Sequence, residues 1–358
     1  MRELPARLKG RTRPADLKYA SQNTRAMPDV AFLTQHDRGP WFRQTPHGDG
    51  VWDACQFTLN ADVSGSDWLV VYDELNAPVP CKLPKSRRLL IISEPPGMKT
   101  YHPGYINQFG ILISPVALPG FAGRWLQEQP GLPWFLGLDM ASSASPVPSR
   151  YDFNALATLA YPQKLHGISA VISTKSKLPK HRRRVEFVLA LKERLGEQFH
   201  LFGRGFREIN DKAEAILPYS HHLVIENNDE DSFFTEKLAD AFLGWSLPVF
   251  SGCRNIGRYF DEGMLMPVDI ERADAMDAIE AILAEPITQP RLDLIATARE
   301  RILRRYNVFA LINDIVVAEG KSNHPAAGAA LLRPNFHYGS LSKRLRLRWR
   351  RMMRSLKR

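Results

Sequence analysis

The sequence lacks any apolar run close to the roughly 20 residues that span a bilayer. Residues 1–20 also lack the apolar segment of a secretory signal, because they carry charge and proline instead. Cysteine is scarce, and Cys55, Cys81 and Cys253 are isolated and odd in number. This argues against a disulfide framework and against zinc-ligand spacing. We therefore expect a cytoplasmic protein with buried or incidental thiols.

A chain of 358 residues exceeds what one hydrophobic core usually serves, so two domains are expected. A stretch rich in Pro, Gly and Ser from Pro115 to Ser149 is typical of a boundary. We predict one domain over residues 1–160, a second over residues 161–330, and a tail over residues 331–358.

Acidic residues are absent from residues 341–358, which hold nine of the 48 basic residues. The net charge of +10 therefore belongs to the tail, since 39 basic residues face 38 acidic ones elsewhere. Apolar residues recur there at helical spacing, which predicts a basic amphipathic helix lying on the anionic inner face of the cytoplasmic membrane. A disordered basic tail remains an alternative. Nucleic acid is not expected, because no recognised fold or aromatic platform accompanies the charge. The apolar positions are Leu341, Leu345, Trp349, Met352 and Leu356.

The stretch from Tyr219 to Phe260 predicts a strand, loop, helix and strand in succession. Leu223–Ile225 has the pattern of a buried strand, and a polar loop follows it. Thr235 can cap the helix after that loop, and Leu247–Phe250 predicts the second strand. This is the repeating unit of a nucleotide-binding α/β layer, in which ligands bind beyond the carboxyl ends of the strands.

Other segments support α/β architecture in both halves of the chain. Two short apolar strands are predicted in the first half, and two strands with three helices in the second. The last helix is predicted to return to the first domain. In order, these elements are Trp68–Tyr72, Leu89–Ile92, Gly167–Ser173, Arg183–Leu195, His200–Phe202, Asp274–Leu283 and Leu292–Tyr306.

Two cationic residues begin predicted helices, where the helix dipole favours an anion. Lys237 opens the helix after the polar loop, and Arg184 opens the helix after a basic loop. Together they predict a phosphate clamp, since a guanidinium fork binds two oxygens. The alternative is ordinary solvated surface charge. Glu226 and Asn227 end the buried strand, so they either contact ligand or cap the loop.

Glu94 follows an apolar strand and precedes Pro95-Pro96. Partial desolvation there would raise its pKa, which suits proton abstraction from a hydroxyl. The alternative is a carboxylate that opens a proline turn.

Three signals are not assigned to function. Asp229-Glu230-Asp231 is interpreted as a solvated acidic loop, and Gly203-Arg204-Gly205 as a turn. His221 and His222 lack partners at ligand spacing and are interpreted as structural.

Three motifs of the second half resemble the family 10 glycosyltransferases, the α-1,3/1,4-fucosyltransferases. They are Ile225-Glu226-Asn227, Thr235-Glu236-Lys237 and the apolar strand that ends at Ser251-Gly252. The likeness extends upstream through His181–Phe187 and Phe202–Gly205, with a weaker echo around Asp67–Asp73 and Ile92–Pro96.

The resemblance implies a GT-B fold, with two Rossmann-like domains facing across a cleft. The first would be the acceptor-side domain, and the second would bind the nucleotide-sugar donor. It implies that Arg184 and Lys237 contact the donor diphosphate, that Glu236 holds its ribose or sugar, and that Phe233 lines the pocket where relatives often carry Tyr. It implies Glu94 as the base.

The implied reaction is metal-independent and inverts the anomeric centre, with GDP-fucose as donor and a cell-surface glycan as acceptor. The product would be an α-1,3-linked fucoside on a polysaccharide or lipopolysaccharide. Two alternatives stay open. One is a transferase for another nucleotide sugar, and the other is a non-catalytic, membrane-attached scaffold that binds nucleotide.

Overall fold

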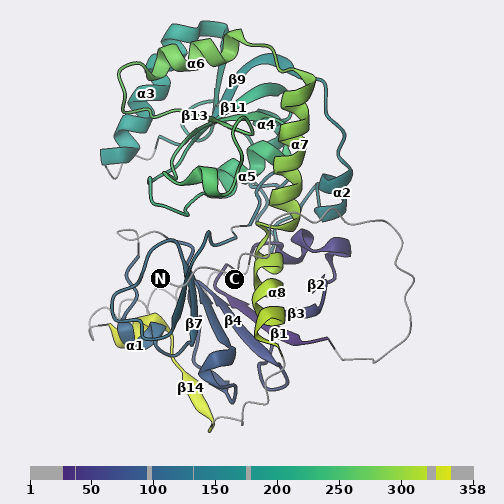
Figure 1. Ribbon diagram of the computed structural model, residues 1–358, viewed down its shortest axis with the longest axis vertical. Coiled ribbons are helices and arrows are strands. Elements are labelled where there is room, and N and C mark those ends of the chain that lie inside the picture. The colour runs from purple at the N-terminus through teal and green to yellow at the C-terminus, as the bar shows by residue number, and fades with distance from the viewer. Residues whose placement is uncertain are drawn as a thin grey trace.

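The computed structural model describes residues 27–36, 38–94, 99–131, 133–174, 179–320 and 328–339. These residues form two α/β bodies, one above the other in Figure 1, each built on its own sheet. Within these ranges, no helix has the length and apolar character needed to cross a membrane. The predicted amphipathic helix over residues 341–358 lies outside the described residues.

The first sheet has seven strands in the order β2-β3-β1-β4-β6-β7-β8. Only β2 runs antiparallel to its neighbour. The predicted strand Trp68–Tyr72 is β4, buried at every position, which is why it reads as an unbroken apolar run. The strands are β1 (Asp29–Thr34), β2 (Val51–Trp52), β3 (Cys55–Leu59), β4 (Trp68–Tyr72), β6 (Arg88–Ile91), β7 (Ile111–Ser114) and β8 (Arg124–Gln127).

The two faces of this sheet belong to two separate hydrophobic cores. Val30 and Phe32 of β1 point into one core together with Phe309 of helix α8 (Val308–Glu319). The alternating residues Ala31 and Leu33 join the other core with α1 (Pro103–Ile106). On that side β14 (Ala330–Leu332) pairs antiparallel with β5 (Val79–Cys81).

The second sheet is parallel throughout, in the order β10-β9-β11-β12-β13. Helices α3 and α6 share a core with one face, and α5 and α7 share a core with the other. The elements are β9 (Leu165–Val171), α3 (Pro179–Leu195), β10 (Phe199–Phe202), α4 (Ala213–Ile216), β11 (Tyr219–Ile225), α5 (Glu236–Leu243), β12 (Leu247–Ser251), β13 (Met266–Pro267), α6 (Ala275–Ala284) and α7 (Gln289–Arg304).

The chain returns to the first sheet by a helix that the sequence did not predict. The predicted helix Leu292–Tyr306 corresponds to α7, which stays with the second sheet and packs against α5 and α2 (Phe153–Thr158). Asn307 then caps α8, accepting from the N–H of Phe309 at 3.0 Å. Figure 1 shows α8 below α7, lying along the first sheet. The expected return by Leu292–Tyr306 is therefore wrong, and α8 makes it.

Candidate functional site

A cavity of about 580 Å³ lies between the two sheets. Its first wall comes from residues that follow β1, β4 and β6, and its second wall from the loop after β11 and the start of α5. Both walls therefore lie at the carboxyl ends of parallel strands, where α/β layers bind ligands. The predicted fold class is confirmed: two Rossmann-like domains face each other across a cleft in the GT-B arrangement.

Thr235 caps α5 as predicted. Its hydroxyl accepts from the N–H of Lys237 at 3.3 Å, and the helix buries Leu238 and Phe242. Thr235, Glu236, Lys237 and Phe233 all line the cleft.

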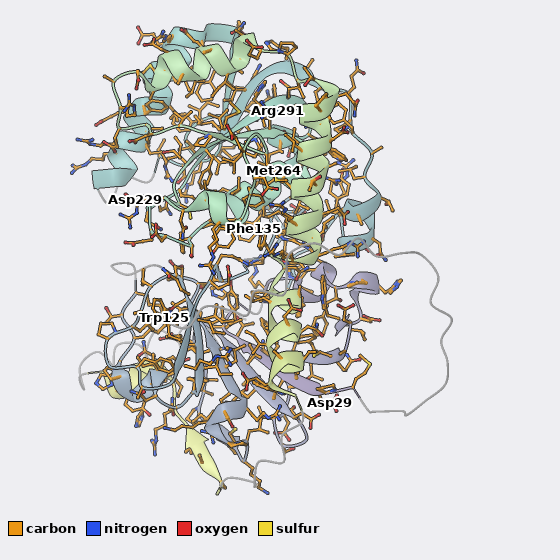
Figure 2. All side chains as sticks on the ribbon, in the orientation of Figure 1. Asp29, Trp125, Phe135, Asp229, Met264 and Arg291 are labelled. Carbon is orange, nitrogen blue, oxygen red and sulfur yellow. The ribbon has the colours of Figure 1, made fainter. Side chains whose placement is uncertain are left out.

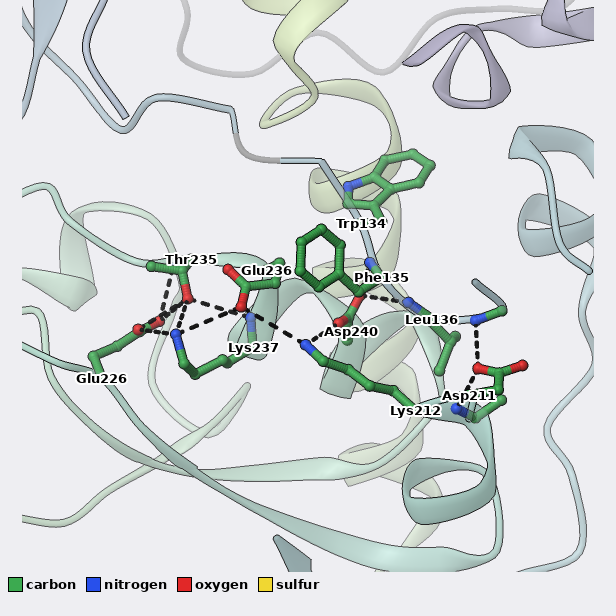
Figure 3. A network of polar contacts seen from close by, with 12 residues as sticks. Trp134, Phe135, Leu136, Asp211, Lys212, Glu226, Thr235, Glu236, Lys237 and Asp240 are labelled. Atoms are coloured by element: carbon green, nitrogen blue, oxygen red, sulfur yellow. Dashed lines mark hydrogen bonds and ion pairs between the residues drawn. The ribbon is translucent and has the colours of Figure 1, made fainter. Parts of the chain in front are cut away.

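Lys237 is held by two carboxylates, as Figure 3 shows. Its Nζ lies 3.1 Å from Oε2 of Glu226 and 3.6 Å from Oε1 of Glu236. Burial disfavours the charged ammonium, but these carboxylates outweigh it and raise the pKa of Lys237. Burial likewise opposes ionisation of Glu236, but Lys237 and Lys212 lower its pKa to about 2. Lys237 and Glu236 therefore stay charged throughout the neutral range.

Glu226 lies behind the cleft and does not line it. Its side chain is fully buried and accepts from the backbone N–H of Thr235 at 2.8 Å and from Nζ of Lys237 at 3.1 Å. It therefore positions the start of α5, while its neighbour Asn227 reaches the cavity.

Arg184 also lies one layer behind the cavity. Its Nη1 donates to Oδ1 of Asn227 at 2.7 Å, and burial lowers its pKa. The residue is 8% exposed, and its Nε has no hydrogen-bond partner among the described residues. The predicted clamp residues are thus gathered at one place, with Asn227 between Arg184 and the cleft.

Buried polar atoms without partners gather at this cleft. Six such side-chain atoms occur among the described residues, and four belong to residues that line the cleft or lie directly behind it. Buried polar groups are normally satisfied, so this clustering indicates a place for a polar ligand. The four atoms are Gln44 Nε2, Tyr72 Oη, Arg184 Nε and Asn228 Nδ2.

Glu94 lies at the end of β6 and lines the cleft, as predicted. Although its side chain is partly open to solvent, the cleft removes some of its water and raises its pKa. The negative charge of Asp73 acts in the same direction, whereas Lys99 and His36 oppose it.

Asp73, for which no role was predicted, organises the first wall. It accepts from Nζ of Lys99 at 2.5 Å, from Nε2 of Gln35 at 2.7 Å, and from the hydroxyl of Tyr101. Burial opposes its ionisation, but His36, Lys99 and Tyr101 lower its pKa to about 2. Its signals in the sequence were its place directly after an apolar strand and the weak family resemblance of Asp67–Asp73.

A second network, also not predicted, ties the segment between the domains to the cleft wall at the start of α5. Oδ1 of Asp240 accepts from the N–H groups of Phe135 and Leu136 at 2.8 and 3.0 Å. Its Oδ2 accepts from Nζ of Lys212 at 2.8 Å, and that Nζ lies 3.7 Å from Glu236. Figure 3 shows this chain of contacts, and Figure 2 shows Phe135 where the two bodies meet.

The acidic loop and the two histidines, which were not assigned to function, do not line the cleft. Arg254 lies 3.8 Å from Glu230 and 3.4 Å from Asp231 in the acidic loop. Nδ1 of His222 lies 2.8 Å from the Ser169 hydroxyl inside the second sheet, and His221 is buried beside it.

No family model matches the sequence, and no curated protein matches it either. The structure is similar to an α1,3-fucosyltransferase with GDP-fucose at 14% identity, covering 88% of this chain and 96% of that one, with a TM-score of 0.46. It is also similar to the pneumococcal O-GlcNAc transferase GtfA with UDP and GlcNAc at 10% identity, covering 74% of this chain and 56% of that one, with a TM-score of 0.39.

Proposed function

We propose that this protein is an inverting glycosyltransferase that moves a sugar from a nucleotide donor to a sugar hydroxyl, with GDP-fucose as the donor. One observation carries the proposal. A single cleft has Glu94, a carboxyl group with a raised pKa, on one wall, and Lys237 with Arg184 behind it on the other.

These two walls suit the two halves of a direct displacement. The acceptor oxygen attacks the anomeric carbon while the bond from that carbon to the diphosphate oxygen breaks. Glu94 takes the proton of the acceptor hydroxyl, and the departing diphosphate keeps the electron pair. Lys237, Arg184 and the first turn of α5 stabilise the negative charge that develops on it.

The wall proposed to bind the nucleotide sugar has N–H groups that are not used in hydrogen bonds within the protein. Nδ2 of Asn228, which lines the cleft, has no partner among the described residues and can donate to a phosphate oxygen. Nε of Arg184 also has no partner among them, but it lies behind Asn227, so Arg184 acts on the diphosphate by its positive charge. Cationic side chains can therefore hold the diphosphate without a metal ion. Glu226 keeps its role as a binding residue through Lys237, and Asn227 keeps its own because it lines the cleft, where Arg184 holds its side-chain oxygen.

The choice of GDP-fucose comes from the motif resemblance. Phe233 lines the cleft at a position where that family often carries Tyr, so one hydrogen bond to the donor would be missing. A different nucleotide sugar used in polysaccharide or lipopolysaccharide synthesis is therefore the alternative donor.

The first test is calorimetric titration with GDP-fucose and with UDP, CMP and dTDP sugars, in the presence of a chelator. We expect saturable binding of GDP-fucose. Preference for another nucleotide sugar would identify that compound as the donor instead of GDP-fucose, and absence of binding would reject the nucleotide site.

Variants test the clamp separately. Arg184→Met should weaken binding of the preferred nucleoside diphosphate about tenfold or more, because charge-assisted hydrogen bonds contribute roughly 1.5–3 kcal/mol. Arg183→Met is the matched control, since Arg183 is exposed and pairs with Glu271. Equal losses in both variants would indicate general electrostatic attraction only.

Glu94→Gln tests the base. We expect kcat to fall about 10²- to 10⁴-fold while donor affinity is unchanged. Full activity in Glu94→Gln would remove Glu94 from the mechanism. Donor binding with no transfer to any acceptor, even by the wild-type chain, would favour the scaffold alternative.

We also propose that residues 341–358 attach the protein to anionic membrane from the cytoplasmic side. Deleting them should abolish co-sedimentation with anionic vesicles at low salt and leave transfer to a soluble acceptor intact. Retained co-sedimentation would contradict this.

A further inference from the structure

We infer that Asp73 and Lys99 form a positioning pair for Glu94: their ion pair fixes one negative and one positive charge behind the cleft wall that carries the candidate base. The inference rests on the proposed function and deepens it, because it assigns residues that set when Glu94 can accept a proton.

The backbone places Asp73 beside the strand that carries Glu94. Strands β4 and β6 are neighbours in the sheet, with Tyr72 opposite Ile91. The N–H of Asp73 donates to the carbonyl of Ile91 at 2.7 Å, which continues the ladder beyond β4. Glu94 is three residues further along the same strand end.

The side chain of Asp73 is fixed by groups from two other segments. It is 2% exposed and binds Lys99 at 2.5 Å, Gln35 at 2.7 Å and the hydroxyl of Tyr101. Its φ of 71° lies in the left-handed region, which a residue with a side chain seldom adopts. Strained backbone persists where surroundings enforce it, and it clusters at functional sites.

Charges from four different segments act on Glu94. Asp73 comes from the end of β4, His36 from the end of β1, Glu236 from the start of α5, and Lys99 from the segment before α1. Burial, Asp73 and Glu236 raise the pKa of Glu94, whereas Lys99 and His36 lower it. Asp73 and Lys99 therefore shift the pKa of Glu94 in opposite directions, although they bind each other.

This opposition separates a positioning role from a merely structural one. Asp73→Asn removes a negative charge and loosens Lys99, so the pKa of Glu94 should fall. Lys99→Met removes a positive charge, so the pKa of Glu94 should rise. Both variants break the same contact, so simple loosening of the wall would shift the pKa of Glu94 in the same direction in both.

The direct test is NMR titration of the Glu94 side-chain carboxyl carbon in the full-length protein, with the signal assigned from its loss in Glu94→Gln. We expect its midpoint to move down by about half a pH unit or more in Asp73→Asn, and up by a similar amount in Lys99→Met. Glu74→Gln is the matched control, because Glu74 also contacts Lys99, at 3.3 Å, but is not among the charges that shift the pKa of Glu94.

The kinetic test follows the acid limb of kcat/KM against pH for transfer from the preferred donor. That limb should shift to lower pH in Asp73→Asn and to higher pH in Lys99→Met, and stay in place in Glu74→Gln. Shifts of the same sign, or no shift in either variant, would overturn the inference. Should Asp73→Asn fail to fold, an unmoved midpoint in Lys99→Met would overturn it alone.

The two proposals can fail separately. Opposite NMR shifts in a protein that transfers no sugar would reject the proposed function and keep the pair. An active transferase whose Glu94 titrates identically in all variants would keep the function and reject the pair.

Discussion

The side chain of Glu226 fills the space next to Gly252. A Cβ at position 252 would lie 2.8 Å from Cγ and 2.9 Å from Cβ of Glu226, closer than real side chains approach. The glycine that ends β12 therefore leaves room for the carboxylate that holds Lys237 and Thr235.

Gly252→Ala should displace Glu226 and loosen the start of α5. We expect a loss of about 1–3 kcal/mol in the free energy of unfolding, and weaker binding of the preferred nucleoside diphosphate. Chemical denaturation and calorimetry measure the two effects. Gly257→Ala is the control, because nothing lies within 4 Å of a Cβ there. Unchanged nucleotide affinity in Gly252→Ala would show that Glu226 does not support the binding site.

Tyr72→Phe should stabilise the protein without ligand. The hydroxyl of Tyr72 is buried with no partner among the described residues, while its ring packs against Trp41 with centroids 4.8 Å apart. Removing only the hydroxyl keeps that packing and relieves a desolvation cost of about 1 kcal/mol or more. Thermal unfolding should show a higher midpoint. A lower midpoint would mean that the hydroxyl is satisfied in solution.

Asp240→Ala should be strongly destabilising. It removes the acceptor of two backbone N–H groups, those of Phe135 and Leu136, and leaves Lys212 without its closest partner. We expect a loss of about 3–5 kcal/mol. Asp240→Asn keeps an oxygen for the N–H groups, so its loss should be smaller. Equal losses in Asp240→Ala and Asp240→Asn would show that the negative charge of Asp240 accounts for the whole effect.

Stability should fall as the pH is lowered below about 6.5. Burial, with Lys212 and Lys164 nearby, lowers the pKa of His222 to about 3. The unfolded chain then binds a proton that the folded chain refuses between pH 6.5 and 3, so stability rises with pH across that window. Between pH 6.5 and 5 the loss should be about 1.5 kcal/mol for this residue. In His222→Gln, the free energy of unfolding measured with urea should depend less steeply on pH. An unchanged pH dependence would show that other groups cause it.

The second half of the fold was predictable because its signals are local. The strand, loop, helix and strand from β11 to β12 follow from apolar periodicity and from the Thr235 cap, and the structure has each of them. Helix α8 was missed, because Asn307 starts it only three residues after α7 ends and no glycine or proline separates them.

The proposed clamp and base were predicted from strand ends and helix starts, whereas the groups that position them were not. The predicted start at Arg183 was wrong for α3, which begins at Pro179, so Arg184 lies in its second turn. Lys99 lies 26 residues from Asp73, and Phe135 lies 105 residues from Asp240. Such partners depend on which strands become neighbours, and periodicity does not report strand order. The sequence left open whether Glu226 contacts ligand or caps the loop, because its burial behind α5 is likewise a tertiary property.

Helix α8 has a consequence for synthesis on the ribosome. Phe309 packs against Phe57 and Phe32 of the first sheet, with ring centroids 4.9 and 5.7 Å apart. The part of that face covered by Phe309 stays uncovered until α8 has been translated, whereas β9 to α7 are contiguous in the sequence and precede α8. Co-translational folding should therefore finish the second body before the first, against the order in which their strands leave the exit tunnel.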